Sequence, residues 1–206
     1  MSKIKVSYFD VDGGRGEPIR IVLHAAGIPF EDFRFGYGEF AEVRKTTPLN
    51  QVPTVNIDGV QYTQSCALLR YFGKAADLYP QDAFQALLCD EIIDGSEDLT
   101  NKLVASFGLQ GDALKSAREA FIAGPLTQYL GWMAAKLAAQ GNYFANGKLT
   151  IGDLKVFMLL RWLSSGMLDH IPADCVSRIA PSLAAYAARI AAEPVLTSYY
   201  ESRAGK

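Results

Sequence analysis

Hydrophobic and polar residues alternate strictly at the start of the chain. Residues 3–9 place Ile4, Val6 and Tyr8 on one face and polar side chains on the other, which is typical of a half-buried strand. Over residues 17–26 the spacing of apolar positions lengthens to that of a helix. The pattern therefore predicts that a strand and then a helix open the chain.

The clearest local signal is a two-residue turn. Asp58-Gly59 stands between the segments 54–57 and 60–62, a pattern that predicts a β-hairpin. The other elements predicted in this part are a strand, a short helical stretch and a helix, at residues 30–35, 39–45 and 65–76. A strand, crossover helix and strand favour a parallel pair, and the hairpin adds antiparallel neighbours. Residues 1–79 are therefore expected to form an α/β domain with a small mixed sheet.

After residues 80–83, which we interpret as a linker, the apolar spacing is helical throughout. The predicted helices are rich in Ala and Leu and cover residues 83–107, 113–139, 151–163 and 181–192. The third has a well-marked start, because Thr150 can cap it and Asp153 lies three residues further on. Residues 84–206 are therefore expected to form an all-helical domain, which makes the fold class α/β followed by all-α.

Composition narrows the possible functions. Half of the 206 residues are apolar and the net charge is −2, so neither a nucleic acid nor an anionic membrane is an expected partner. No apolar run approaches the ~20 residues that span a bilayer, and the opening sequence lacks a signal-peptide core. A cytoplasmic protein is therefore expected.

Cysteine and histidine usage argues against a disulfide framework and against a metal site. Cys66, Cys89 and Cys175 are odd in number and unclustered, and the two histidines lie far apart. A reducing compartment fits this usage. We interpret Cys66 as a buried packing residue.

A glycine-rich loop lies between the first strand and the first helix, where such loops often hold phosphate. Its spacing argues against the common nucleotide motifs. A dinucleotide-binding motif would need a glycine in place of Ile19, and a Walker loop would need Lys in place of Glu17. Gly13, Gly14 and Gly16 are therefore expected to present something other than a phosphate.

Six segments along the chain form a recognisable series. They are YF at residues 8 and 9, GRGEPIR, TPLNQVPTVNIDG, YTQSCALLRYF, LTIGDL and PVLTSYYESR. In this order they resemble the cytosolic glutathione transferases, most nearly the sigma class, over essentially the whole chain. The resemblance implies a thioredoxin-like glutathione-binding domain, a helical domain that forms the electrophile site, and a homodimer. It also implies glutathione as co-substrate, with no permanently bound cofactor and no metal.

The resemblance gives catalytic roles to Tyr8 and Arg15. Tyr8 would donate a hydrogen bond to the glutathione sulfur and favour the thiolate, and Arg15 would support the thiolate electrostatically. From the residues alone, Tyr8 could instead be a core aromatic and Arg15 a solvated loop residue. The expected activity is conjugation of glutathione to small electrophiles, with a peroxidase or isomerase side activity. The alternative is a non-catalytic ligand-binding or structural protein on the same scaffold.

The resemblance also implies which residues hold glutathione. A cis bond to Pro53 would turn the Val52 backbone outward to pair with the cysteinyl unit, and the helix start at Gln64 and Ser65 would bind the glutamyl carboxylate. Asp98 would reach the glutamyl amine in the neighbouring subunit. The residues expected at the glycyl end, where most of the binding would rest on the arginine, are Phe40, Arg44 and Gln51.

The electrophile would lie against the helical domain and the glycine loop. Its expected walls are Val11, Gly14, Thr100, Phe107 and Lys155. Relatives often have apolar or aromatic groups where Thr100 and Lys155 stand, which argues against the prostaglandin isomerisation of some sigma-class relatives. Lys155 would attract anionic electrophiles, unless its ammonium reaches bulk water.

Overall fold

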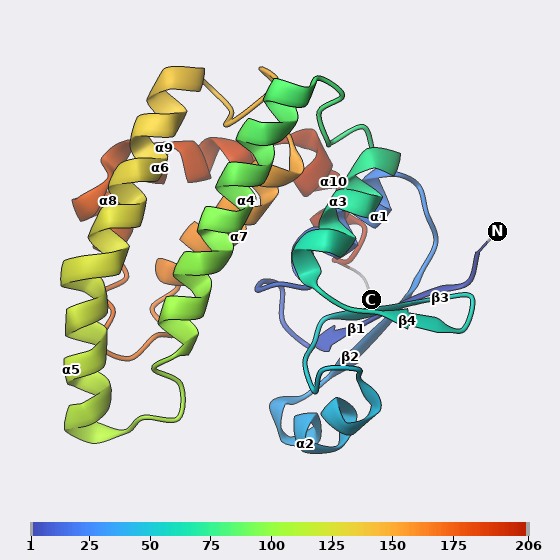
Figure 1. Cartoon of the computed structure of the whole chain (residues 1–206), viewed down its shortest axis with the longest axis horizontal. Helices are drawn as coiled ribbons and strands as arrows, with labels where there is room; N and C mark the ends of the chain where they lie inside the picture. Colours follow the sequence, from blue (N-terminus) through green and yellow to red (C-terminus); the bar gives the residue numbers. More distant parts are fainter. Residues whose placement is uncertain (1, 205–206) are drawn as a thin grey trace. The chain divides into compact units, whose positions relative to one another are not determined.

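The computed structural model describes residues 2–204 and divides them into two compact units (Figure 1). The sheet unit consists of residues 2–79 and 194–204, and the helical unit consists of residues 80–193. Residues 194–204 depart from the predicted helical domain, because α10 (Pro194–Glu201) contacts the first helix of the chain.

Among the described residues, one sheet has four strands in the order β2-β1-β3-β4. β1 (Ile4–Phe9) pairs in parallel with β2 (Glu31–Phe35), and β3 (Thr54–Ile57) pairs antiparallel with β1 and with β4 (Val60–Tyr62). The two turn residues between β3 and β4 both have positive φ, 51° and 91°, which suits a two-residue hairpin turn. The predicted small mixed sheet is thus confirmed.

Helices α1 (Glu17–Ala25) and α3 (Ser65–Ala75) belong to the sheet unit with α10, and α1 contacts both of the others. Between β2 and β3, where a helical stretch over 39–45 was predicted, α2 (Phe40–Val43) stands between two 3-10 turns. Those turns are Tyr37–Glu39 and Arg44–Thr46. The core of the unit consists of fully buried apolar side chains, among them Val6, Ile19, Ile21, Val22 and Val55.

The helical unit is built around its most deeply buried helix, α7 (Ile151–Leu163), which contacts α4 (Ala83–Val104) and α9 (Pro181–Ala191). The predicted cap at the start of α7 is confirmed. The buried Asp153 carboxylate accepts hydrogen bonds from the N–H of Thr150, at 2.8 Å, and from the hydroxyl of Tyr186, at 2.8 Å. In the described part of the chain, no helix is both long enough and apolar enough to cross a membrane.

The single helix predicted over residues 113–139 is divided in the structure. α5 (Gly111–Phe121) is followed by a π-helical turn, Ile122–Leu126, and then by α6 (Thr127–Gln140). Pro125 lies inside that turn and has no N–H to donate, so regular α-helical pairing is interrupted there. The short helix α8 (Cys175–Ile179) and α10 were not predicted.

Candidate active site

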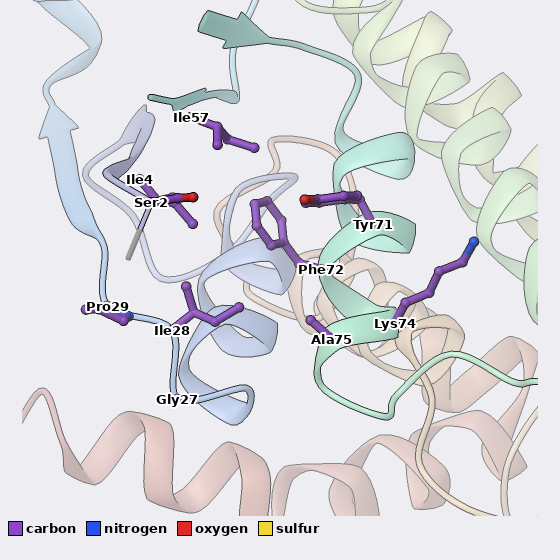
Figure 2. A pocket seen from close by; sticks show the side chains of 10 residues that line it. All are labelled: Ser2, Ile4, Gly27, Ile28, Pro29, Ile57, Tyr71, Phe72, Lys74 and Ala75. Carbon is purple, nitrogen blue, oxygen red and sulfur yellow. The ribbon is translucent and has the colours of Figure 1, made fainter. Parts of the chain in front are cut away.

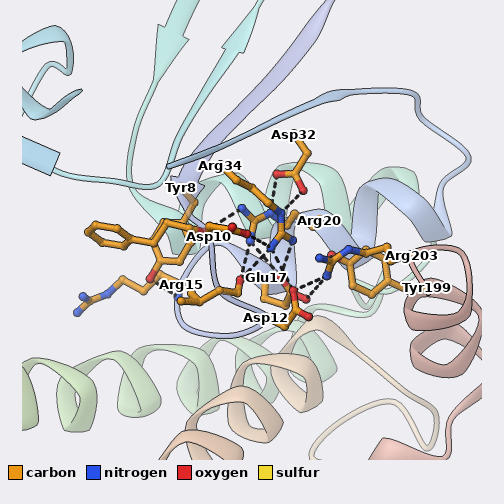
Figure 3. Close-up of polar contacts among 12 residues, drawn as sticks. Tyr8, Asp10, Asp12, Arg15, Glu17, Arg20, Asp32, Arg34, Tyr199 and Arg203 are labelled. Carbon is orange, nitrogen blue, oxygen red and sulfur yellow. Dashed lines mark hydrogen bonds and ion pairs between the residues drawn. The ribbon is translucent and has the colours of Figure 1, made fainter. Parts of the chain in front are cut away.

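Tyr8 lies next to the end of β1 and is 8% exposed. Its hydroxyl oxygen accepts a hydrogen bond from the backbone N–H of Arg15, at 3.1 Å, so the hydroxyl proton remains available to another acceptor (Figure 3). Burial raises the pKa of Tyr8, and the Arg15 hydrogen bond and charge only partly oppose this effect. At neutral pH, Tyr8 is therefore a protonated hydrogen-bond donor.

Two glycines of the loop fit closely around Tyr8. A Cβ atom at Gly14 would lie 2.4 Å from the Tyr8 hydroxyl oxygen, and one at Gly16 would lie 2.4 Å from Cγ of the ring. Gly14 also has a φ of +64°, which other residues rarely adopt. A Cβ atom at Gly13 would meet nothing within 4 Å. The loop needs glycine because its backbone runs along the tyrosine.

The residues predicted for the glycyl end of glutathione gather near Phe9. The Phe40 ring lies 5.1 Å from the Phe9 ring, and the guanidinium carbon of Arg44 lies 5.5 Å from the Phe40 ring. Thr47, which the sequence analysis did not single out, links two of these residues. Its hydroxyl donates to the Arg44 carbonyl at 2.8 Å and accepts from the N–H of Gln51 at 3.0 Å. The structure therefore brings Phe40, Arg44 and Gln51 together.

The remaining predicted glutathione residues of the sheet unit lie before β3 and after β4. The Val52-Pro53 bond is cis. Gln64, directly before α3, has a φ of 71° and a ψ of 95°, a strained conformation that is common at ligand sites. Its side chain makes no capping hydrogen bond to α3. The N–H groups in the first turn of this helix, which begins at Ser65, therefore suit a carboxylate ligand.

The predicted site residues of the helical unit lie on α4, on α7 and in the turn after α4. Asp98 is exposed on α4, whereas Thr100 is buried and its hydroxyl donates to a backbone carbonyl one turn earlier, at 2.8 Å. Phe107 is 51% exposed. Lys155 is 5% exposed, and its ammonium pairs with the Glu97 carboxylate at 2.5 Å. Its ammonium therefore does not reach bulk water, and its charge is paired within the helical unit.

Comparison with known proteins decides the family. Residues 97–203 match the family model described as glutathione S-transferase, C-terminal domain. The chain is also 31% identical to glutathione S-transferase 3 of Caenorhabditis elegans over 180 residues, which are 84% of this chain and 86% of that protein. The chain belongs to the glutathione S-transferase family.

Solved structures agree with this assignment. Prostaglandin synthase D of Nilaparvata lugens is 29% identical, and the two chains cover 98% of each other with a TM-score of 0.86. A monomeric glutathione S-transferase of Necator americanus, Na-GST-3, is 26% identical and has a TM-score of 0.81 over 98% of this chain and 97% of that one. The predicted fold class and the predicted transferase enzyme class are confirmed.

In this glutathione S-transferase, a group of paired charges surrounds the glycine loop (Figure 3). We call it the arginine cluster, and its members are Asp12, Glu17, Arg20, Asp32, Arg34 and Arg203. Arg20 is fully buried and donates to Glu17 at 3.0 Å and to Asp32 at 2.8 Å. It also donates to the carbonyls of Phe9 and Val11, at 3.3 and 3.1 Å. Arg20 therefore ties the end of β1 and the start of the loop to α1.

Arg34 and Arg203 extend the cluster to β2 and to the residues after α10. Arg203 donates to Asp12 at 2.5 Å and to Glu17 at 3.4 Å, and Arg34 donates to Asp12 at 3.1 Å. Burial opposes ionisation of Asp12, but Arg203 and Arg34 outweigh it and lower the pKa of the carboxyl. Burial raises the pKa of Glu17 by more than its arginine neighbours lower it.

The sequence analysis missed the arginine cluster, although one signal was available. Arg20 stands between Ile19 and Ile21 in the predicted first helix, and Glu17 precedes it by three residues. A charge on the apolar face of a helix, with an opposite charge one turn away, indicates a buried ion pair.

The interpretation of Cys66 as a buried packing residue is wrong. Cys66 is partly exposed, whereas Cys89 and Cys175 are buried. The difference arises because Cys66 lies in the first turn of α3, at the surface. Burial raises the pKa of Cys89 to about 11, so this thiol stays protonated at neutral pH.

A hollow of about 610 Å³ lies at the other end of β1 from Tyr8. Ile4, Ile57 and Phe72 point into it, and Lys74 points away (Figure 2). None of the residues predicted for the glutathione or electrophile sites lines this hollow.

Proposed function

We propose that this chain binds glutathione along the sheet unit, holds its sulfur as a thiolate through the Tyr8 hydroxyl, and conjugates it to small electrophiles. The proposal depends mainly on one observation, which is the hydrogen bonding and protonation of the Tyr8 hydroxyl. Its oxygen already accepts the Arg15 N–H at 3.1 Å, and burial keeps it protonated, so it can donate to sulfur. A donor of this kind favours the charged form of its acceptor.

The Tyr8 hydroxyl can supply the stabilisation that the glutathione thiolate needs at neutral pH. A free thiol of pKa ~8.5 is only about 3% ionised at pH 7. Lowering that pKa by about two units makes the thiol mostly thiolate, which corresponds to ~2.7 kcal/mol. One or two charge-assisted hydrogen bonds supply this amount. The Arg15 side chain extends away from the arginine cluster (Figure 3), and its charge adds to the positive potential around the sulfur.

The two carboxylates of glutathione have separate binding groups in this proposal. The glutamyl carboxylate binds the first turn of α3, at Gln64 and Ser65, while the glycyl carboxylate pairs with Arg44 beside Phe40. The Val52 backbone pairs with the cysteinyl unit. Asp98, exposed on α4, reaches the glutamyl amine of glutathione bound to a second copy.

The residues proposed to contact the electrophile are Val11 and Gly14 of the sheet unit and Thr100 and Phe107 of the helical unit. Lys155 contributes less charge to this site than the sequence predicted, because Glu97 neutralises it. The site is therefore proposed to accept neutral electrophiles readily. A peroxidase or isomerase side activity and a sigma-class assignment remain part of the proposal. The likeness to the Nilaparvata lugens prostaglandin synthase supports the sigma class and an isomerase, whereas Thr100 and Lys155 argue against prostaglandin isomerisation itself.

A cytoplasmic homodimer completes the proposal. The structural relative from Necator americanus is described as monomeric, so the oligomeric state needs its own measurement. Light scattering at micromolar concentration is expected to give twice the chain mass of 22.5 kDa. A monomeric mass would contradict both the dimer and the role given to Asp98.

The experiment that tests the function is a panel of electrophiles and hydroperoxides, each assayed with glutathione on the wild type and on Tyr8→Phe. We expect turnover of an activated aryl halide near pH 6.5 to fall by about 10- to 100-fold in the variant, while glutathione binding is nearly kept. Full turnover in Tyr8→Phe would make Tyr8 a core aromatic. No turnover of any substrate by the wild type, with glutathione bound, would favour the non-catalytic alternative.

A further inference from the structure

Arg118, in the last turn of α5, is a buried cation with two nitrogen atoms that have no hydrogen-bond acceptor among the described residues. The residue is 4% exposed, and its Nε and Nη1 atoms are buried with no acceptor within hydrogen-bond distance. Guanidinium remains charged in proteins, and a buried charge without hydrogen bonds costs free energy. Native structures rarely leave such a group unsatisfied unless a ligand or partner satisfies it.

Lys155, another buried cation of the helical unit, has the counter-ion that Arg118 lacks among the described residues. Lys155 is as deeply buried as Arg118, yet its ammonium meets the Glu97 carboxylate at 2.5 Å. Asp169 is the acidic residue whose charge acts on Arg118, but it accepts no hydrogen bond from Nε or Nη1 of the guanidinium. The fold therefore supplies a counter-ion to Lys155 but not to Arg118.

Aromatic side chains next to Arg118 indicate the kind of ligand that would fit. The guanidinium carbon lies 5.4 Å from the Phe107 ring, and the Trp162 ring meets Phe107 edge to face at 5.9 Å. Phe107 is half exposed and lies beyond the end of α4 at Val104, so its side chain can rotate without breaking a helix. Rotation would open the guanidinium to a ligand whose own ring packs beside Phe107.

We propose that Arg118, Phe107 and Trp162 form a binding site for small aromatic carboxylates. The carboxylate accepts hydrogen bonds from two N–H groups of Arg118 at once, and the aromatic body packs against Phe107 and Trp162. This site shares Phe107 with the proposed electrophile site, so it rests on that proposal and names a ligand class for it. It needs neither Tyr8 nor bound glutathione.

The test uses 4-phenylbutanoate and its neutral analogue 4-phenylbutanamide, in the absence of glutathione. Binding is followed by tryptophan fluorescence, because Trp162 lies in the site and the chain has only one other tryptophan. We expect the carboxylate to bind the wild type and Arg118→Met to bind it about 10-fold more weakly or worse. The control is Lys115→Met, which removes an exposed cation from the same helix and should leave binding unchanged.

A second measurement keeps the test decisive if Arg118→Met does not fold. In the wild type alone, the carboxylate should raise the melting temperature and the amide should not, because a ligand that binds only the folded state stabilises it. Tyr8→Phe should respond in the same way, which separates this site from the proposed catalytic one. Equal effects of carboxylate and amide, or equal binding by wild type and Arg118→Met, would overturn the proposal.

Discussion

Arg20 in the sheet unit and Arg118 in the helical unit are both buried, but only one has its hydrogen bonds satisfied. Arg20 is fully buried and donates to two carboxylates and to two backbone carbonyls. Arg118 has two buried nitrogen atoms without an acceptor among the described residues. The comparison teaches that burial alone does not define the role of a charged side chain, because the available acceptors decide it.

In the sheet unit, paired charges hold a loop in place. The carbonyls of Phe9 and Val11, on either side of the turn after β1, both accept hydrogen bonds from Arg20. The glycines that follow fit against Tyr8. The proposed catalytic hydroxyl is therefore fixed by a buried ion-pair network rather than by an apolar core alone.

The largest expected effect tests this contrast directly. Arg20→Met removes the nearest counter-ion of the buried Glu17, which keeps only its longer pairs with Arg203 and Arg34, at 3.4 and 3.6 Å. We therefore expect the free energy of unfolding to fall by about 3–5 kcal/mol. Arg118→Met removes an unpaired buried charge and should leave stability equal or higher. Denaturant unfolding measures both. Equal losses of unfolding free energy in the two variants would contradict the distinction between Arg20, which stabilises the fold, and Arg118, which is proposed to bind a ligand.

A second variant, Glu97→Gln, would remove the counter-ion of the buried Lys155. Glu97→Gln leaves Lys155 buried with a neutral neighbour, and we expect a loss of ~1–3 kcal/mol because Glu97 is itself partly exposed. The freed charge should also lower the Michaelis constant for anionic electrophiles, with neutral electrophiles unaffected. If both substrate classes respond alike, Lys155 does not face the electrophile, and its place in that site is wrong.

Much of the fold followed from local patterns. The strand at Tyr8, the hairpin turn at Asp58 and the cap at Thr150 each depend on residues close together in the sequence, and all are present. The division of the helix at Pro125 was missed because the apolar spacing continues through the proline, while its missing N–H changes only the backbone pairing.

The site was harder to predict because its partners are distant in the sequence. Arg203 pairs with Asp12 from the far end of the chain, and Lys155 pairs with Glu97 from another helix. No spacing rule connects such residues. The glycines of the loop were recognised, but their reason, close contact with Tyr8, depends on packing that only the structure reveals.

The smallest expected effect concerns the partly exposed edge of the arginine cluster. Arg203→Met should cost about 1 kcal/mol at neutral pH, because the side chains of Arg203 and Asp12 both reach solvent. The pKa of Asp12 is lower in the folded protein than its value of ~3.9 in the unfolded chain, so the ionised carboxylate stabilises the fold above about pH 4. This stabilisation is lost as the pH falls from that value through the lowered pKa. The stability difference between wild type and variant should therefore shrink below about pH 4.

Denaturant unfolding at several pH values measures this difference. The matched control is Arg178→Met, which removes an arginine from a more exposed ion pair in the helical unit and should change stability less. A difference for Arg203→Met that stays constant from neutral to strongly acidic pH would show that its charge pairs do not contribute.

The most direct test of the central claim is the titration of the glutathione thiol while it is bound, followed by the ultraviolet absorption of the thiolate. In the wild type, the account predicts a pKa about two units below the ~8.5 of a free thiol, and in Tyr8→Phe a return most of the way to that value. Glutathione should bind both proteins with similar affinity, because other groups hold its two carboxylates. A bound thiol that titrates at the same pH in both proteins would contradict the role proposed for Tyr8.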